Sequence, residues 1–266
     1  MFIVKLNRGH LLKKIIGAIK EILVHAVLEC SPFGIFIHAL DPSNICFVFI
    51  ELHCDGFDEY VCDKTQMLGI DVNALSSVLN GITNTDFITM SGGDNADIIT
   101  FVYHSQNSSN ISSYNLKLLN LEQENMELPN EFDHTCMLTM PSQEFFRICR
   151  DINQIGNDIN IKITFTGNQV KFSAVGDKLV DVKITINQDN ISKDKQINFT
   201  VNQPTSATFS GKYLNLFTRA TPLSENVYIS IYNSILKVEY KIDKSFCLSY
   251  FLSSKIEDDI NDSDIE

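Results

Sequence analysis

The segment MPSQEFFRICRDINQIG, at residues 140–156, is the strongest indicator of the fold of this chain. Its apolar side chains recur at the i, i+3, i+4 and i+7 spacing of an amphipathic helix: Phe145, Ile148, Cys149, Ile152 and Ile155. Arg147, Arg150 and Gln154 fall on the opposite face. Because the chain has a formal net charge of −12, this basic helix face is unexpected and points to a function.

A similar helix is predicted half a chain earlier, at residues 10–23. Its apolar residues follow the same spacing. Its opposite face carries three cations: Lys13, Lys14 and Lys20. A shift of 133 positions places Ile15 on Ile148 and Lys14 on Arg147, and this shift is half of the 266-residue chain.

A second pair of shorter helices is predicted at residues 72–81 and 211–220, where a shift of 139 places Leu75 on Leu214. Two helices per half, in matching order, indicate an internally duplicated protein with two similar domains. Short β-rich runs separated by polar turns fill the rest of both halves. The predicted fold class is therefore α+β with antiparallel sheets.

An acidic segment separates the two halves. Residues 120–131 contain no basic residue and include Pro129, which is typical of a linker. The last ten residues carry six acids and no base, as expected for a flexible tail. The predicted divisions are an N-terminal domain (1–117), a connecting loop (118–135), a C-terminal domain (136–256) and an acidic tail (257–266).

Composition limits the class of protein. A chain with 44% apolar residues can bury two cores of ordinary size. Seven cysteines form no C-x-x-C pair and several lie in apolar runs, which favours reduced thiols in a reducing compartment. The sequence starts without a signal-peptide pattern and has no apolar stretch of about 18 residues. We therefore expect a soluble intracellular protein without a metal or cofactor.

Nine short blocks, in order and at nearly matching spacing, resemble the eukaryotic sliding clamps of the proliferating cell nuclear antigen family. They lie at residues 12–14, 56–63, 94–97, 140–156, 170–174, 213–215, 220–224, 238–242 and 255–259. The resemblance implies a homotrimeric ring with two clamp domains per chain, helices lining the hole and sheets outside. It implies a non-enzymatic nuclear function. The ring would encircle duplex DNA as a polymerase processivity factor and would dock replication and repair proteins.

By the same resemblance, the strand near residues 109–117 pairs across the subunit boundary with the strand near residues 178–185. The implied interface residues are Tyr114, Leu116, Leu179 and Val182. A head-to-tail contact with a suitable rotation closes a ring and leaves no sheet edge exposed.

Positive charge is concentrated on the four predicted helices. They hold seven Lys or Arg against three acids, whereas acids outnumber bases thirty to fourteen elsewhere. Lys and Arg hold phosphates without reading sequence, so ring closure can retain DNA while it slides. On one helix alone a solvated face is the simpler interpretation, but four helices and the resemblance favour DNA. The predicted DNA contacts are Lys13, Lys14, Lys20, Lys64, Arg147, Arg150, Lys212 and Arg219.

The chain departs from the family pattern on these helices. Ser77 and Asn80 stand where the family usually has lysines, and Gln154 where it has a histidine. We therefore expect a weaker and less salt-sensitive grip on DNA. The family's modifiable lysine is absent from the predicted hairpin at residues 164–168, which puts modification there in doubt.

Partners of this family dock a motif containing a glutamine, an aliphatic residue and two aromatics into an apolar pocket beneath the linker. The clamp loader and DNA polymerase are among the partners that the resemblance implies. Asn44, Ile235 and the pair Ser253-Ser254 replace the usual residues, so shifted preferences are expected. For Phe47 an ordinary core position is the alternative interpretation. The implied pocket residues are Leu40, Asn44, Ile45, Phe47, Met126, Leu128, Ile235, Tyr250, Phe251, Leu252 and Ser253.

Two alternatives stay open at this point. His53-Cys54-Asp55 and Cys62-Asp63 could form a metal or thiol site of a hydrolase, although an alternating strand and turn explain them better. A subunit of the related heterotrimeric checkpoint clamp is the closer rival. Whether the chain is the main replicative clamp or a diverged copy is not decided by the residues.

Overall fold

The computed structural model describes residues 1–94, 97–105, 111–121, 135–156, 159–176, 180–187 and 197–255. The first half contains β1 (Phe2–Leu6), α1 (Gly9–Ile19), β2 (His25–Ser31), β3 (Gly34–Leu40), β4 (Cys46–His53), the 3₁₀ turn η1 (Cys54–Gly56), β5 (Glu59–Cys62), β6 (Gln66–Asp71), α2 (Val72–Leu79), β7 (Asp86–Gly92), β8 (Ile98–Ser105) and β9 (Ile111–Lys117). The second half contains β10 (Cys136–Pro141), α3 (Ser142–Asn153), β11 (Asn160–Thr166), β12 (Gln169–Val175), β13 (Asp181–Asn187), β14 (Asn198–Val201), β15 (Thr205–Ser210), α4 (Gly211–Phe217), the 3₁₀ helix η3 (Thr218–Leu223), β16 (Asn226–Tyr232), β17 (Ile235–Lys241) and β18 (Phe246–Ser253).

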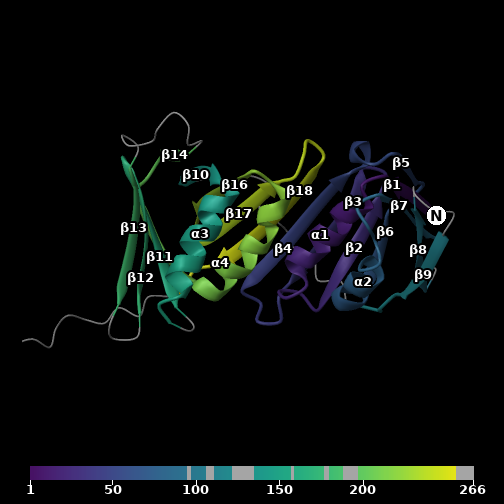
Figure 1. Ribbon diagram of the computed structural model, residues 1–266, viewed down its shortest axis with the longest axis horizontal. Helices are drawn as coiled ribbons and strands as arrows, with labels where there is room; N and C mark the ends of the chain where they lie inside the picture. The colour runs from purple at the N-terminus through teal and green to yellow at the C-terminus, as the bar shows by residue number, and fades with distance from the viewer. Residues whose placement is uncertain are drawn as a thin grey trace, which may run out of the picture.

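The two halves repeat the same antiparallel topology. The order β5-β1-β7-β8-β9 in the first half corresponds to β14-β10-β16-β17-β18 in the second, and β4-β3-β2-β6 corresponds to β13-β12-β11-β15. The predicted duplication and the α+β fold class are therefore confirmed. Strands β18 and β4 pair with each other, so two of these sheets merge into one nine-stranded sheet that crosses both halves (Figure 1).

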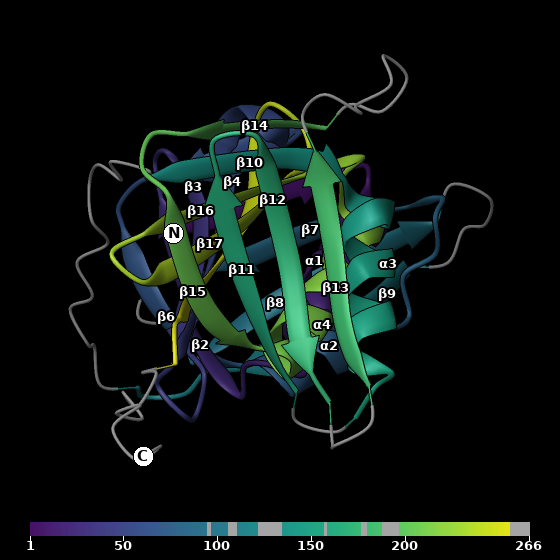
Figure 2. The ribbon, with the colours of Figure 1, turned by 90° about the vertical axis from the view of Figure 1, so that its left-hand side faces the viewer.

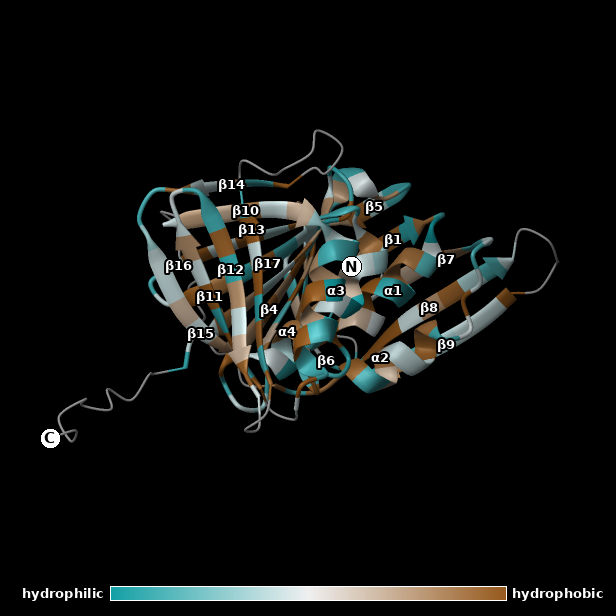
Figure 3. Ribbon diagram, turned by 60° about the vertical axis from the view of Figure 1, so that its left-hand side comes forward, coloured by the Kyte–Doolittle hydropathy of each residue, from teal (hydrophilic) through white to brown (hydrophobic). Residues whose placement is uncertain are grey.

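Four helices lie in a row along one side of the nine-stranded sheet, in the order α3, α4, α1 and α2, and we call them the helix row (Figure 1). Their buried faces match the predicted stripes, since Ile15, Ile148 and Ile152 are fully buried. Hydrophilic and hydrophobic bands alternate along α1 and α3 in Figure 3, as expected for helices with one buried face. Among the described helices, none is long and apolar enough to cross a membrane.

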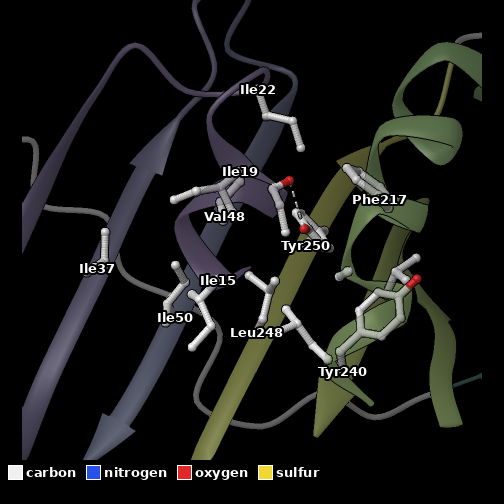
Figure 4. Packing of buried hydrophobic residues seen from close by; sticks show 14 of the residues in the cluster. Ile15, Ile19, Ile22, Ile37, Val48, Ile50, Phe217, Tyr240, Leu248 and Tyr250 are labelled. Atoms are coloured by element: carbon white, nitrogen blue, oxygen red, sulfur yellow. Dashed lines mark hydrogen bonds between the residues drawn. The ribbon is translucent and has the colours of Figure 1, made fainter. Parts of the chain in front are cut away.

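We call the junction of the halves, at β18 and β4, the internal joint. Tyr250 of β18 is fully buried there, its ring stacks on Phe217 at 4.3 Å, and its hydroxyl donates to the Ala18 carbonyl at 3.3 Å (Figure 4). Complete burial of a side chain of this size contributes roughly 2–3 kcal/mol. On the same boundary Arg8 pairs with Asp243 at 2.9 Å. Sheet pairing and side-chain packing thus join the two halves into one body.

Candidate functional site

The cations of α1 have two different environments. Lys13 Nζ donates to the carbonyl oxygens of Asn80 (2.7 Å) and Ile82 (3.3 Å), just past the end of α2. Asn80 is the C-cap of α2, where the carbonyls carry the negative end of the helix dipole and attract an ammonium group. Lys13 therefore joins two helices. Lys14 is exposed and Lys20 half-buried, and within the described residues neither side chain forms a hydrogen bond.

The cations of α3 are paired with acids of the same helix. Arg147 bonds to Glu144 at 2.7 Å and to Asp151 at 3.2 Å, and Arg150 bonds to Asp151 at 2.9 Å. The carboxylate of Glu144 raises the pKa of Arg147. Two arginines and two carboxylates leave this face without net charge, so a phosphate would have to compete for the guanidinium groups.

The remaining predicted cations fall in two places. Lys212 and Arg219 are exposed on α4 and η3, and Arg219 forms an ion pair with Glu21. Lys64 lies instead between β5 and β6, where it bonds to Asp94 at 3.0 Å. The structure therefore groups seven of the eight predicted cations on the helix row or directly after its helices α1 and α4, and places Lys64 outside it.

The described members of the predicted partner site lie at or near the ends of β3, β4, β17 and β18, around the loop between β3 and β4. A surface pocket of about 510 Å³ is lined by Leu40, Asn44 and their neighbours together with Leu121, at the start of the predicted connecting loop. Ile45 is 39% exposed beside it. Met126 and Leu128 lie outside the described residues.

Strand alternation divides the predicted residues of β18 and β4. The rings of Phe251 and Phe47 contact each other at 5.9 Å, and both side chains are largely buried. Tyr250 and Leu252 point the opposite way and are fully buried in the core. Ser253 pairs with Ile235, so both lie at the strand ends near the loop between β3 and β4.

Two positions that depart from the family pattern, Asn44 and Ile235, lie at or beside backbone with positive φ. Asn44 has φ 58°, in the left-handed region that asparagine tolerates better than most residues. Asn233 and Ser234 have φ 42° and 66° in the two-residue turn between Tyr232 and Ile235, as in a type I′ hairpin. This turn sets the position of Ile235, the first residue of β17.

Sequence reasoning missed several residues of this surface. His38 and Val27 line the pocket beside Leu40. His38 also lies 6.4 Å from the Phe49 ring, which stacks with Phe36 at 6.2 Å. Burial lowers the pKa of His38, so it is neutral at physiological pH. The period-two pattern of β3 could have placed Phe36, His38 and Leu40 on one face.

The predicted interface strands lie at sheet edges. Within the described residues β9 pairs only with β8, and β13 only with β12; we call β9 and β13 the open edges (Figure 2). On β9, Ile111 is 65% and Tyr114 39% exposed, whereas Leu116 is buried. Val182 of β13 is half-buried. Leu179 lies outside the described residues. Exposed apolar edges of this kind invite pairing with another chain.

The chain matches two family descriptions in sequence. Residues 1–126 match the proliferating cell nuclear antigen N-terminal domain, and residues 128–255 match the corresponding C-terminal domain. Clamps of this family are not catalytic, they bind DNA and self-assemble, and they bind polymerases. In the part of the chain that the structure describes, no three His, Cys, Asp or Glu side chains are placed to hold a metal ion. The chain therefore belongs to the proliferating cell nuclear antigen family and acts as a DNA sliding clamp, a processivity factor in DNA replication and repair.

Proposed function

We propose that three copies of this chain close into a ring by repeating, between chains, the pairing seen at the internal joint. Strand β9 occupies the same place in its sheet as β18, and β13 the same place as β4. Strands β18 and β4 pair with each other inside the chain, whereas β9 and β13 have open edges within the described residues. Pairing β9 of one copy with β13 of the next satisfies both edges and continues the helix row around the ring.

The internal joint also supports a register for this contact. Tyr250 lies opposite Val48 at the joint. The cross-strand row Val4, Met90, Phe101 and Tyr114 repeats in the second half as Leu138, Ile229, Val238 and Tyr250, which makes Tyr114 the counterpart of Tyr250. The matching two-residue turns before β3 and β12 make Val182 the counterpart of Val48. Tyr114 of one copy would therefore lie opposite Val182 of the next. Leu116 and Leu179 belong to the same proposed interface.

We propose that DNA passes along the helix row and meets Lys14, Lys20, Arg147, Arg150, Lys212 and Arg219. Lys13 would add positive potential while it holds the end of α2, and Lys64 would contact DNA only outside the row. Helix α2 carries no charged residue and α3 has no net charge, which supports the expected weak grip. Retention by ring closure does not need strong phosphate contacts.

The pocket beside Leu40 is the proposed docking site for partner peptides with a glutamine, an aliphatic residue and two aromatics. Its apolar lining and the adjacent exposed Ile45 suit such side chains. Phe47, Phe251, Ile235 and Ser253 would extend the site, Met126 and Leu128 would cover it, and Tyr250 and Leu252 would support it from the core. The clamp loader and polymerases are the proposed users, and the nucleus is the proposed location.

The family matches on either side of residue 127 support the proposed domains, which are 1–117, 118–135, 136–256 and 257–266. The observation that carries the ring is the equivalence of the open edges and the internal joint. Loading onto a nicked circular plasmid followed by linearisation tests it. We expect retention on circles and loss from linear DNA ends. Equal retention on both would contradict an encircling ring.

A further inference from the structure

A buried carboxylate organises the loop between β3 and β4, which carries Asn44 and Ile45. Asp41 is 3% exposed and also lines the pocket. Its Oδ1 accepts hydrogen bonds from the N–H groups of Ile45 (2.9 Å) and Cys46 (2.7 Å), and its Oδ2 accepts one from Ser43 (3.0 Å). The shape of the loop therefore depends on this one side chain.

The fourth donor comes from the other half of the chain. Tyr213 lies on α4, and its hydroxyl donates to Asp41 Oδ2 at 2.6 Å, across 172 positions of sequence. The preceding residue, Lys212, is exposed and belongs to the proposed DNA contacts. Tyr213 thus connects the helix row directly to the rim of the pocket.

The charge states make this a strong hydrogen bond. Burial opposes ionisation of Asp41, but the bonds from Tyr213 and the three backbone groups outweigh it and lower the pKa of Asp41. Burial and the bond to Asp41 raise the pKa of Tyr213 to about 12. At neutral pH a carboxylate therefore faces a protonated phenol, and such charge-assisted bonds are roughly twice as strong as neutral ones. Without the hydroxyl, Oδ2 would keep only the Ser43 donor.

We infer that Tyr213 is a positioning residue for partner docking, because it fixes the loop at residues 41–45 through Asp41. This inference rests on the proposed docking function of the pocket. Tyr213 itself would not touch the partner. It sets the place of Asn44 and Ile45, and a helix of the C-terminal half thereby controls a site on the N-terminal half.

The test variant is Tyr213→Phe, which removes the hydroxyl and keeps the ring beside Phe217 at 6.4 Å. The control is Tyr228→Phe on β16, where the ring lies under Lys241 and far from the loop in the sheet order. A labelled peptide with the glutamine, aliphatic and aromatic motif is titrated against each ring at about pH 7.5 and about pH 5.

We expect Tyr213→Phe to bind the peptide about five- to tenfold more weakly at neutral pH, with the control unchanged. The pKa of Asp41 rises when its phenol partner is removed, so on going to the acid pH the variant should lose more affinity than the wild type and the control, which share the pocket residue His38. Amide exchange of Ser43, Ile45 and Cys46 should be faster in the variant.

Three results would overturn the inference. The first is equal peptide affinity of Tyr213→Phe and wild type. The second is weaker binding with unchanged amide exchange in the loop, since the effect would not pass through Asp41. The third is failure of the wild type itself to bind the peptide, which would refute the proposed pocket as well and is thereby distinguishable from the first two.

Discussion

The internal joint and the open edges are built from equivalent strands, yet their side chains differ. At the joint Arg219 forms an ion pair with Glu21. The shifts that relate the helices place Asn80 on Arg219 and Gln154 on Glu21, so two neutral amides would meet between copies. The joint is also covalently continuous, whereas the contact between copies is not. In the proposed ring, the joint inside the chain would be permanent while the contact between chains could open for loading.

A second difference separates the two long helices of the row. On α1 the cations have no acidic partners on the same helix, and on α3 each arginine is paired with an acid. In the proposed ring the same fold would therefore offer DNA two unequal surfaces. A helix can thus keep its place in a ring while its share of phosphate binding changes.

The strongest effect is expected where the open edges would join as the internal joint does. Tyr114→Ala removes the counterpart of the buried Tyr250. Loss of a large aromatic anchor typically costs about 2 kcal/mol or more at each contact. Native mass spectrometry should show about 90 kDa for the wild type, three times the 30.0 kDa chain, and mainly monomer for the variant. A stable trimer of Tyr114→Ala would refute the equivalence, and Tyr228→Ala serves as the control.

A second, intermediate effect concerns the difference between α1 and α3. Changing Glu144→Gln together with Asp151→Asn frees the arginines of α3. We expect tighter DNA binding. The slope of log binding constant against log salt concentration should become steeper by about 0.9 for each additional phosphate that the arginines neutralise. Binding to a short duplex is measured across a salt series. The control is Glu59→Gln, which breaks the ion pair between Glu59 on β5 and Lys5 on β1, outside the helix row. An unchanged slope would mean that α3 does not face DNA.

A smaller effect is expected from copying the ion pair of the joint into the contact between chains. Asn80→Arg with Gln154→Glu should stabilise the trimer by about 0.5–1 kcal/mol, because exposed pairs contribute little. The protein concentration at which trimers dissociate should fall about two- to fivefold. Each single variant should lack this stabilisation. A double variant that dissociates more readily than wild type would argue against the inferred neighbours.

The weakest effect is expected on the pH dependence of the joint. Burial alone would raise the pKa of Asp243, but bonds from Ser245, Arg8 and Phe246 outweigh it and lower that pKa below its usual value. A group with a lowered folded-state pKa stabilises the protein above its unfolded value, and this stability is lost as pH falls through the folded value. Thermal unfolding between about pH 6 and 3 should therefore show a shallower acid loss for Asp243→Asn than for wild type. Identical profiles would show that Asp243 does not contribute to the stability of the joint.

Much of the fold follows from periodicity and internal repetition. The stripe through Ile148 and Ile152 predicts α3, and the shift of 133 extends that prediction to α1. The start of β2 gives no local signal, because the apolar residues 22–24 run from the end of α1 into the strand without a break. Pairing of β18 with β4 depends on contacts about 200 positions apart, which no local pattern reveals.

The site was less predictable than the fold. The pairing of Arg147 with Glu144 and Asp151 could have been foreseen, since acids three and four positions away face the same side of a helix. The bond of Lys13 to the end of α2 and that of Tyr213 to Asp41 could not, because both join distant segments. The contacts of the connecting loop through Met126 and Leu128 stay predictions.

Cross-linking of the open edges is the direct test of the proposed ring contact. Ser113 and Lys183 are the counterparts of Ser249 and Phe49, which lie opposite each other at the joint. Opposed residues on antiparallel strands lie about 4.5–5.5 Å apart between Cα atoms, within reach of a disulfide. Oxidation of a chain carrying Ser113→Cys and Lys183→Cys should yield a covalent species of about 90 kDa by denaturing mass spectrometry. No cross-linking above that of the wild type would contradict the proposal that β9 and β13 join one copy to the next.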